Sequence, residues 1–198
     1  MGSCSAVVVV PAFNEEKTIE RVVNTAKQFA LVLVVDDGSS DETAIRASRA
    51  GAEVIGFDHN QGYEAALELG FNHAFSELKA NAVITVDADG EHDPEIITQF
   101  IIAINQGFHL VLGKRLTKAR LLEHLIALLI QKEFHVSDIF CGMRGYSRHV
   151  WSLAPKFDPG KSLGTWLVLN LIRKNIPFTE ITVSGTTRID CSRFRADP

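Results

Sequence analysis

The chain has 198 residues, of which 46% are hydrophobic, and a formal net charge of -4. This length fits one domain with a sizeable core, and the charge gives no electrostatic case for nucleic-acid binding. The three cysteines, Cys4, Cys141 and Cys191, are odd in number and far apart, which argues against a disulfide framework or a structural zinc site. No apolar run reaches the roughly 18–20 residues of a membrane span, and the N-terminus has no signal-peptide pattern. We therefore expect a cytoplasmic protein without a transmembrane segment.

Apolar runs and helical periodicities alternate along the first half of the chain. In order, we expect a strand at 6–10, a helix at 17–29, a strand at 31–35, a helix ending near 50, a strand at 53–57, a helix at 63–78, a strand at 82–86, a helix at 94–105 and a strand at 109–113. Further on, we expect helices at 119–134 and 165–174 and a strand at 178–183. This alternation predicts an α/β fold with a mostly parallel sheet and helices on both faces.

Polar clusters follow three of the expected strands directly. They are Asn14-Glu15, Asp36-Asp37-Gly38 and Asp87-x-Asp89. Because ligands of such sheets bind at the carboxyl ends of the strands, we expect these distant segments to converge on one site. The chain contains neither G-x-G-x-x-G nor G-x-x-x-x-G-K-[ST], so the sequence favours a site built from acids rather than from a glycine-rich phosphate loop.

The third cluster is unusually acidic, with carboxylates at Asp87, Asp89, Glu91 and Asp93. Neighbouring like charges repel one another, so a cation is expected to offset them. Hard oxygen ligands suit Mg²⁺ or Mn²⁺, which commonly bind through one or two carboxylates together with substrate phosphates. The alternative is an acidic surface turn without a metal.

The second half offers basic residues and one broad apolar helix. Lys114-Arg115 follows a strand and suits either a diphosphate contact or a solvated basic turn. The helix expected at 119–134 has a wide apolar face, which suits packing on the sheet, contact with a membrane surface, or pairing in a homo-oligomer. The segment 138–148 places an acid and two arginines among glycines, where a second, anionic substrate would fit.

Together these segments resemble a known enzyme family. Pro11-Ala12-Phe13-Asn14-Glu15-Glu16, Val35-Asp36-Asp37-Gly38-Ser39-Ser40-Asp41 and Asp87-Ala88-Asp89-Gly90-Glu91 resemble the motifs of family 2 glycosyltransferases, which have the GT-A fold, a Rossmann-like sheet with a D-x-D metal site at its strand ends. Gly113-Lys114-Arg115, the stretch from Asp138 to Ser147, and Glu180-Ile181-x-Val183 with Arg188 resemble the dolichyl- or polyprenyl-phosphate sugar transferases. The chain departs from the family pattern at Gly62-Tyr63-Glu64, where G-K-G or G-x-G is usual.

The resemblance implies a role for each matching residue. The nucleotide sugar would be bound by Pro11, Phe13 and Glu15 at the base and ribose, Val35 and Asp37 at the base with Asp36 in support, Asp87 and Ala88 along the ribose, and Arg115, Arg188 and Arg193 at the phosphates. Asp89 and Glu91 would hold Mg²⁺ or Mn²⁺. Asp138 and Arg144 would lie by the acceptor and, with Asp89, form the catalytic set.

The resemblance further implies one catalytic domain over 1–198, with a nucleotide-sugar half at 1–113 and an acceptor half at 114–198. We expect an inverting transfer of a hexosyl group to a polyprenyl or dolichyl phosphate at the cytoplasmic membrane surface. A lipid phosphate is already anionic and needs no base, whereas a hydroxyl acceptor would need one, for which Asp138 is the candidate. Two alternatives remain: a transferase acting on a soluble glycan, protein or metabolite, and a nucleotide-sugar-binding protein without turnover.

Overall fold

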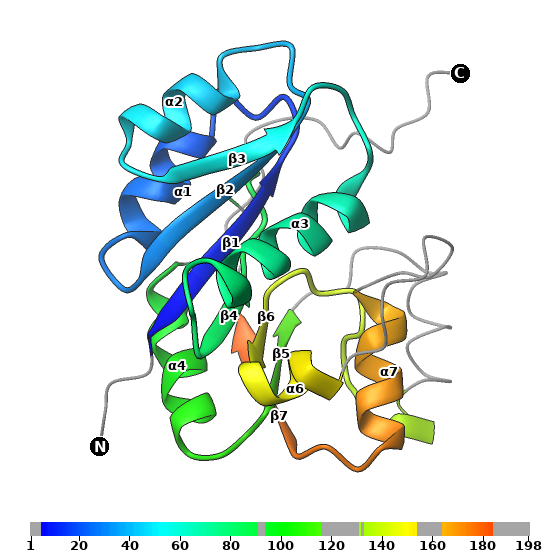
Figure 1. Ribbon diagram of the computed structural model, residues 1–198. Coiled ribbons are helices and arrows are strands. Elements are labelled where there is room, and N and C mark those ends of the chain that lie inside the picture. The colour runs from blue at the N-terminus through cyan, green and yellow to red at the C-terminus, as the bar shows by residue number, and fades with distance from the viewer. Residues whose placement is uncertain (1–4, 91–93, 116–130, 132, 154–163, 184–198) are drawn as a thin grey trace.

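The computed structural model describes residues 5–90, 94–115, 131, 133–153 and 164–183 (Figure 1). The strands are β1 (Ala6–Ala12), β2 (Leu31–Asp37), β3 (Glu53–Phe57), β4 (Ala82–Thr85), β5 (Leu110–Arg115), β6 (Arg144–Ser147) and β7 (Phe178–Val183). The helices are α1 (Ile19–Ala26), α2 (Thr43–Arg49), α3 (Tyr63–Ser76), α4 (Ile97–Asn105), α6 (Arg148–Leu153) and α7 (Thr165–Arg173), and a 3-10 turn, η1 (Pro94–Ile96), precedes α4.

The strands form one sheet in the order β3-β2-β1-β4-β6-β5-β7. All neighbours are parallel except β6, which runs antiparallel to both β4 and β5. The mostly parallel α/β sheet predicted from the sequence is therefore confirmed. Strand β6 and helix α6 were not predicted.

The β-branched run of β1 explains the two-sided core. Successive side chains of a strand point to opposite faces. Val7 and Val9 join the core beneath α3, α6 and α7, whereas Val8 and Val10 join the core beneath α1, α2 and α4 (Figure 1). All four are buried, so β1 reads as a continuous apolar run because both of its faces are covered.

Helix α3 lies close against the sheet. A Cβ built on Gly70 would lie 2.6 Å from Val9 Cγ1 and 2.9 Å from Val35 Cγ2, so only a glycine permits this approach. The helix begins at Tyr63, just after the carboxyl end of β3. Its first turn thereby reaches the edge of the sheet where the polar clusters lie.

In the part of the chain that the structure describes, no helix combines the length and the apolar character needed to cross a lipid bilayer.

Candidate active site

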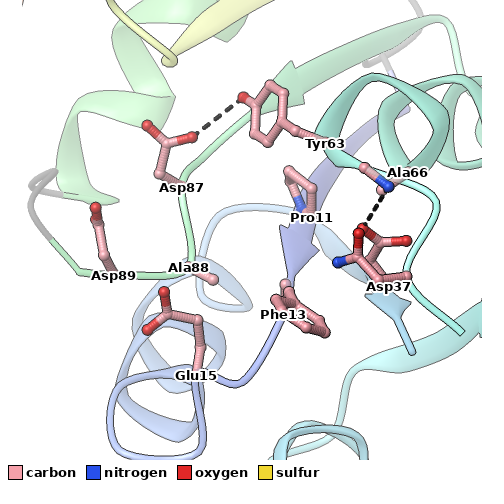
Figure 2. Close-up of a pocket in the computed structure, with 12 residues that line it drawn as sticks. Pro11, Phe13, Glu15, Asp37, Tyr63, Ala66, Asp87, Ala88 and Asp89 are labelled. Carbon is pink, nitrogen blue, oxygen red and sulfur yellow. Dashed lines mark hydrogen bonds between the residues drawn. The ribbon is translucent and has the colours of Figure 1, made fainter. Parts of the chain in front are cut away.

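A cleft of about 380 Å³ lies at the carboxyl ends of β1, β2 and β4 (Figure 2). Its lining comes from four segments that are distant in the sequence. It comprises Pro11, Ala12, Phe13, Glu15, Asp37, Asn60, Gly62, Tyr63, Ala66, Asp87, Ala88 and Asp89. The convergence expected from the strand-end rule is thus present in the fold.

Hydrogen bonds join the loop after β1 to the loop after β2. The Asn14 N–H donates to Ser39 Oγ (2.9 Å), and the Ser40 N–H donates in return to Asn14 Oδ1 (2.9 Å). Asn14 adopts φ +53°, a left-handed conformation that asparagine tolerates better than most residues. The Glu15 N–H donates to Thr43 Oγ1 at the start of α2 (2.8 Å), which fixes the backbone of Glu15 at the cleft.

Asp37 lines the cleft beside the turn that precedes α3. Its side chain is buried, and its two carboxylate oxygens accept from the N–H groups of Gln61 (2.7 Å) and Gly62 (2.8 Å). These donors belong to the turn before α3. Asp37 therefore both lines the cleft and positions the first turn of α3.

Asp87 faces away from Asp89, toward α3 (Figure 2). Its Oδ1 accepts from the Tyr63 hydroxyl (3.2 Å), and a Cβ built on Gly142 would lie 2.2 Å from its Oδ2. Helix α1 contacts the turn that follows Asp89, because Arg21 Nη2 donates a hydrogen bond to the carbonyl of Gly90 (3.2 Å). Gly90 has φ +74°, which favours glycine at this turn.

The described residues include no cluster of three metal-ligating side chains. Asp87 and Asp89 nevertheless line the cleft together. Because Asp87 is turned toward Tyr63, Asp89 is the carboxylate placed to hold Mg²⁺ or Mn²⁺, and these ions commonly bind through one or two carboxylates together with water and substrate phosphates. Glu91, the other expected ligand, lies outside the described residues.

A second cavity, of about 240 Å³, adjoins the cleft. Tyr63 and Asp87 line both spaces and form the partition between them. Arg144, at the start of β6, lines the second cavity and is only 6% exposed. Its Nε and Nη2 donate to the carbonyls of Cys141 (2.9 Å) and Ile139 (2.6 Å).

Arg115 and Asp138 bind each other. Arg115 donates from Nε to Oδ2 (2.8 Å), from Nη2 to Oδ1 (3.0 Å) and from its backbone N–H to Oδ2 (3.1 Å). Burial alone would raise the pKa of the Asp138 carboxyl, but the hydrogen bonds and positive charge of Arg115 outweigh it and lower that pKa below its ordinary value. A carboxylate held in this way is a weak proton acceptor. The sequence analysis expected Arg115 to contact a phosphate and Asp138 to act as a general base. In this conformation the two side chains bind each other instead.

The structure brings most of the expected nucleotide-site residues together. Those that line the cleft are Pro11, Phe13, Glu15, Asp37, Asp87, Ala88 and Asp89. Val35 is instead fully buried in the core, and Asp36 accepts from the Ser39 hydroxyl (2.5 Å) to shape the turn after β2; neither lines the cleft or the second cavity. Arg188 and Arg193 lie outside the described residues, as does most of the helix expected at 119–134.

Sequence reasoning missed Asn60, Tyr63 and Glu64 as site residues. Asn60 and Tyr63 line the cleft, and Tyr63 and Glu64 line the second cavity. The available signal was their position after β3, the neighbour of β2 at the edge of the same parallel sheet.

The fold is that of a glycosyltransferase of the GT-A class. Residues 7–120 match the family described as glycosyl transferase family 2, and the chain belongs to this family. Its structure resembles glucosyl-3-phosphoglycerate synthase from Mycobacterium tuberculosis in complex with phosphoglyceric acid, with a TM-score of 0.80 and 22% identity over 96% of this chain and 73% of that one. The same synthase has a structure in complex with Mn²⁺, UDP-glucose and phosphoglyceric acid, with a TM-score of 0.76 at 22% identity over 93% of this chain and 73% of that one.

Among curated relatives, an undecaprenyl-phosphate 4-deoxy-4-formamido-L-arabinose transferase of Edwardsiella ictaluri is 35% identical over 164 residues, covering 72% of this chain and 49% of the relative. An uncharacterized protein of Methanocaldococcus jannaschii, MJ0544, is 27% identical over 199 residues, covering 90% of this chain and 86% of the relative. The chain thus spans about half the length of the transferase it matches.

Proposed function

We propose that this chain transfers a glycosyl group from a nucleotide-diphosphate sugar to a polyprenyl phosphate, with inversion at the anomeric carbon. The observation that carries the proposal is the convergence of Phe13, Asp37 and the two carboxylates Asp87 and Asp89 on one cleft. The relatives named undecaprenyl-phosphate sugar transferases support the class of acceptor. The structures of the Mycobacterium tuberculosis synthase with Mn²⁺ or Mg²⁺ support the use of a divalent cation.

In the proposed reaction, an acceptor oxygen attacks the anomeric carbon while the bond to the diphosphate breaks, and a nucleoside diphosphate leaves. Asp89, with Glu91 as the second ligand expected from the sequence, would hold a divalent cation, which would offset the negative charge that develops on the leaving group. Phe13 offers an apolar face to the base, and the loop fixed by Asp37 closes the other side of the cleft. A phosphate acceptor carries its own negative charge, so this reaction needs no residue to remove a proton.

The test has two stages. Thermal shifts with UDP, GDP and their sugars, each with and without Mn²⁺, identify the nucleotide, because a ligand of the native state raises its apparent stability. The selected donor, labelled in its sugar, is then incubated with undecaprenyl phosphate in detergent or with 3-phosphoglycerate in water. Label extracted into organic solvent supports the proposal, and label retained on the soluble acid overturns the acceptor assignment.

Asp89→Asn provides the control for the metal assignment. The variant keeps the size of the side chain and loses one carboxylate charge from the cleft. We expect the stabilisation added by Mn²⁺ to be lost together with transfer, while the melting temperature of the free protein changes little. If the variant transfers sugar at the wild-type rate, Asp89 is not a metal ligand.

A further inference from the structure

We infer that the second cavity binds the transferred sugar ring, and that Glu64 and Arg144 restrict it to an uncharged ring. The inference rests on the proposed function and deepens it by naming a class of donor. It arises from the walls of a space that adjoins the acid-lined cleft through Tyr63 and Asp87. Glu64 stands where the family pattern has a glycine, so the selection belongs to this chain.

The first observation is a buried donor without a partner. Arg144 Nη1 has no hydrogen-bond partner in the part of the chain that the structure describes, although its other guanidinium nitrogens donate to backbone carbonyls. An unsatisfied N–H of a buried charge is unfavourable, because it has given up its water without gaining another acceptor. Gly164 lies against this nitrogen: a Cβ there would be 2.9 Å from Nη1. The absence of a side chain at Gly164 keeps the donor accessible to a ligand in the cavity.

The second observation is the charge of the other walls. The carboxylates of Glu64 and Asp87 both line the cavity, and Glu64 Oε2 is anchored to the start of α7 by the Gly164 N–H (3.2 Å). One cation and two carboxylates do not favour a further anion, because like charges repel strongly where water is excluded. The same walls combine a donor, Arg144 Nη1, with the acceptor oxygens of the two carboxylates. This mixture suits the hydroxyl groups of a neutral sugar.

The third observation is size. At about 240 Å³ the cavity is smaller than the roughly 300–1,000 Å³ of sites for drug-sized ligands. This is room for one sugar ring beside the cleft.

The test is a matched pair of donors that differ in one carboxylate. For a uridine site the pair is UDP-glucose and UDP-glucuronic acid, and for a guanosine site it is GDP-mannose and GDP-mannuronic acid, each compared with the nucleoside diphosphate by calorimetry in Mg²⁺. We expect the neutral sugar to bind about tenfold more tightly than the acidic one. Glu64→Gln should reduce this ratio several-fold, whereas binding of the diphosphate alone stays unchanged.

Gly164→Ala tests the contribution of Arg144 without replacing it, although the guanidinium must shift because a Cβ there would lie 2.9 Å from Nη1. Gly164 has helical φ and ψ (-60°, -68°), so alanine fits the backbone there, and its methyl would cover Nη1. We expect the neutral nucleotide sugar to bind this variant no more tightly than the nucleoside diphosphate alone does. Glu68→Gln, one helical turn after Glu64 and lining neither the cleft nor the second cavity, is the matched control and should leave all affinities unchanged.

The outcomes separate the two proposals. Equal binding of the neutral and acidic donors by the wild type overturns the charge selection, and unchanged sugar affinities in both Glu64→Gln and Gly164→Ala overturn the placement of the ring. Both results leave the proposed function intact, because the diphosphate still binds. Failure of every diphosphate and nucleotide sugar to bind instead overturns the proposed function, and the sugar subsite with it.

Discussion

Replacing Arg115 by methionine leaves the buried Asp138 carboxylate without its ion-pair partner. The side chain of Asp138 is 2% exposed and that of Arg115 is 26% exposed, so the pair is largely withdrawn from water. Removing one partner of a buried pair costs about 3–5 kcal/mol. The variant can escape part of this cost by binding a proton at Asp138.

Because Asp138 can bind a proton, the free energy of unfolding that the variant loses has an upper limit, and this limit depends on pH. Holding a carboxyl protonated costs about 1.4 kcal/mol for each pH unit above its ordinary pKa, which is 3.8 for Asp138. The stability lost with the charge pair is thus limited to about 4 kcal/mol at pH 7 and about 1.6 kcal/mol at pH 5. In the wild type the lowered pKa of Asp138 contributes stability that is fully present above pH 3.8 and is lost only as the pH falls through that lowered pKa. The pH trend between 5 and 7 therefore arises from the variant.

Urea denaturation of the wild type and of Arg115→Met at pH 5 and pH 7 measures this difference. Lys114→Met, at the exposed neighbouring residue, is the control and should change the free energy of unfolding by less than about 0.5 kcal/mol. The double variant Arg115→Met/Asp138→Asn removes the charge and should abolish the pH trend. A loss below about 1 kcal/mol at pH 7, or an equal loss at both pH values, would refute the view that the pair stabilises the fold.

Two further predictions concern buried polar groups. Asp37→Ala removes the acceptor from the N–H groups of Gln61 and Gly62, so we expect a loss of about 2–4 kcal/mol in urea denaturation and weaker nucleotide binding; unchanged stability would show that water replaces the carboxylate. Burial raises the pKa of the Cys141 thiol to about 11, so iodoacetamide at pH 8 should label Cys141 only after denaturation, as read by peptide mass mapping. Equal labelling of native and denatured protein would contradict its burial.

The first half of the sheet could be predicted because its signals are local. The run Ala6–Val10 and the strand Leu31–Val35 are continuous and β-branched, and each ends at a polar cluster. Strand β6 carries no such signal, since it reads Arg144-Gly145-Tyr146-Ser147. It is a strand because β4 and β5 pair with it on both sides. A Cβ on Gly145 would lie 3.2 Å from Phe100 and Ile104 on α4, so glycine lets the helix approach.

In the candidate active site, too, local sequence signals could be predicted, whereas contacts made only in the folded chain could not. The strand-end rule located Phe13, Asp37 and Asp89 because each lies at or shortly after the end of a strand with an obvious apolar run. It did not reveal that Arg115 and Asp138 bind each other, because 23 residues separate them and each charge alone suggested its own role. Nor did it show Tyr63 as the partition between the two spaces, which depends on how closely α3 packs on β1.

The charge of the cleft explains why a cation belongs to the proposed reaction. Its described lining includes the four carboxylic acids Glu15, Asp37, Asp87 and Asp89, and no lysine or arginine. Arg115, at the end of β5, is paired with Asp138, and Arg144 lies across the partition. A nucleoside diphosphate entering alone would therefore meet its own sign of charge. A divalent ion held by Asp89 would offset that repulsion. Because coupling between two ligands is reciprocal, the nucleotide would then raise the affinity for the metal as much as the metal raises the affinity for the nucleotide. If the proposed function holds, we therefore expect nucleotide binding itself, and not turnover alone, to depend on the metal.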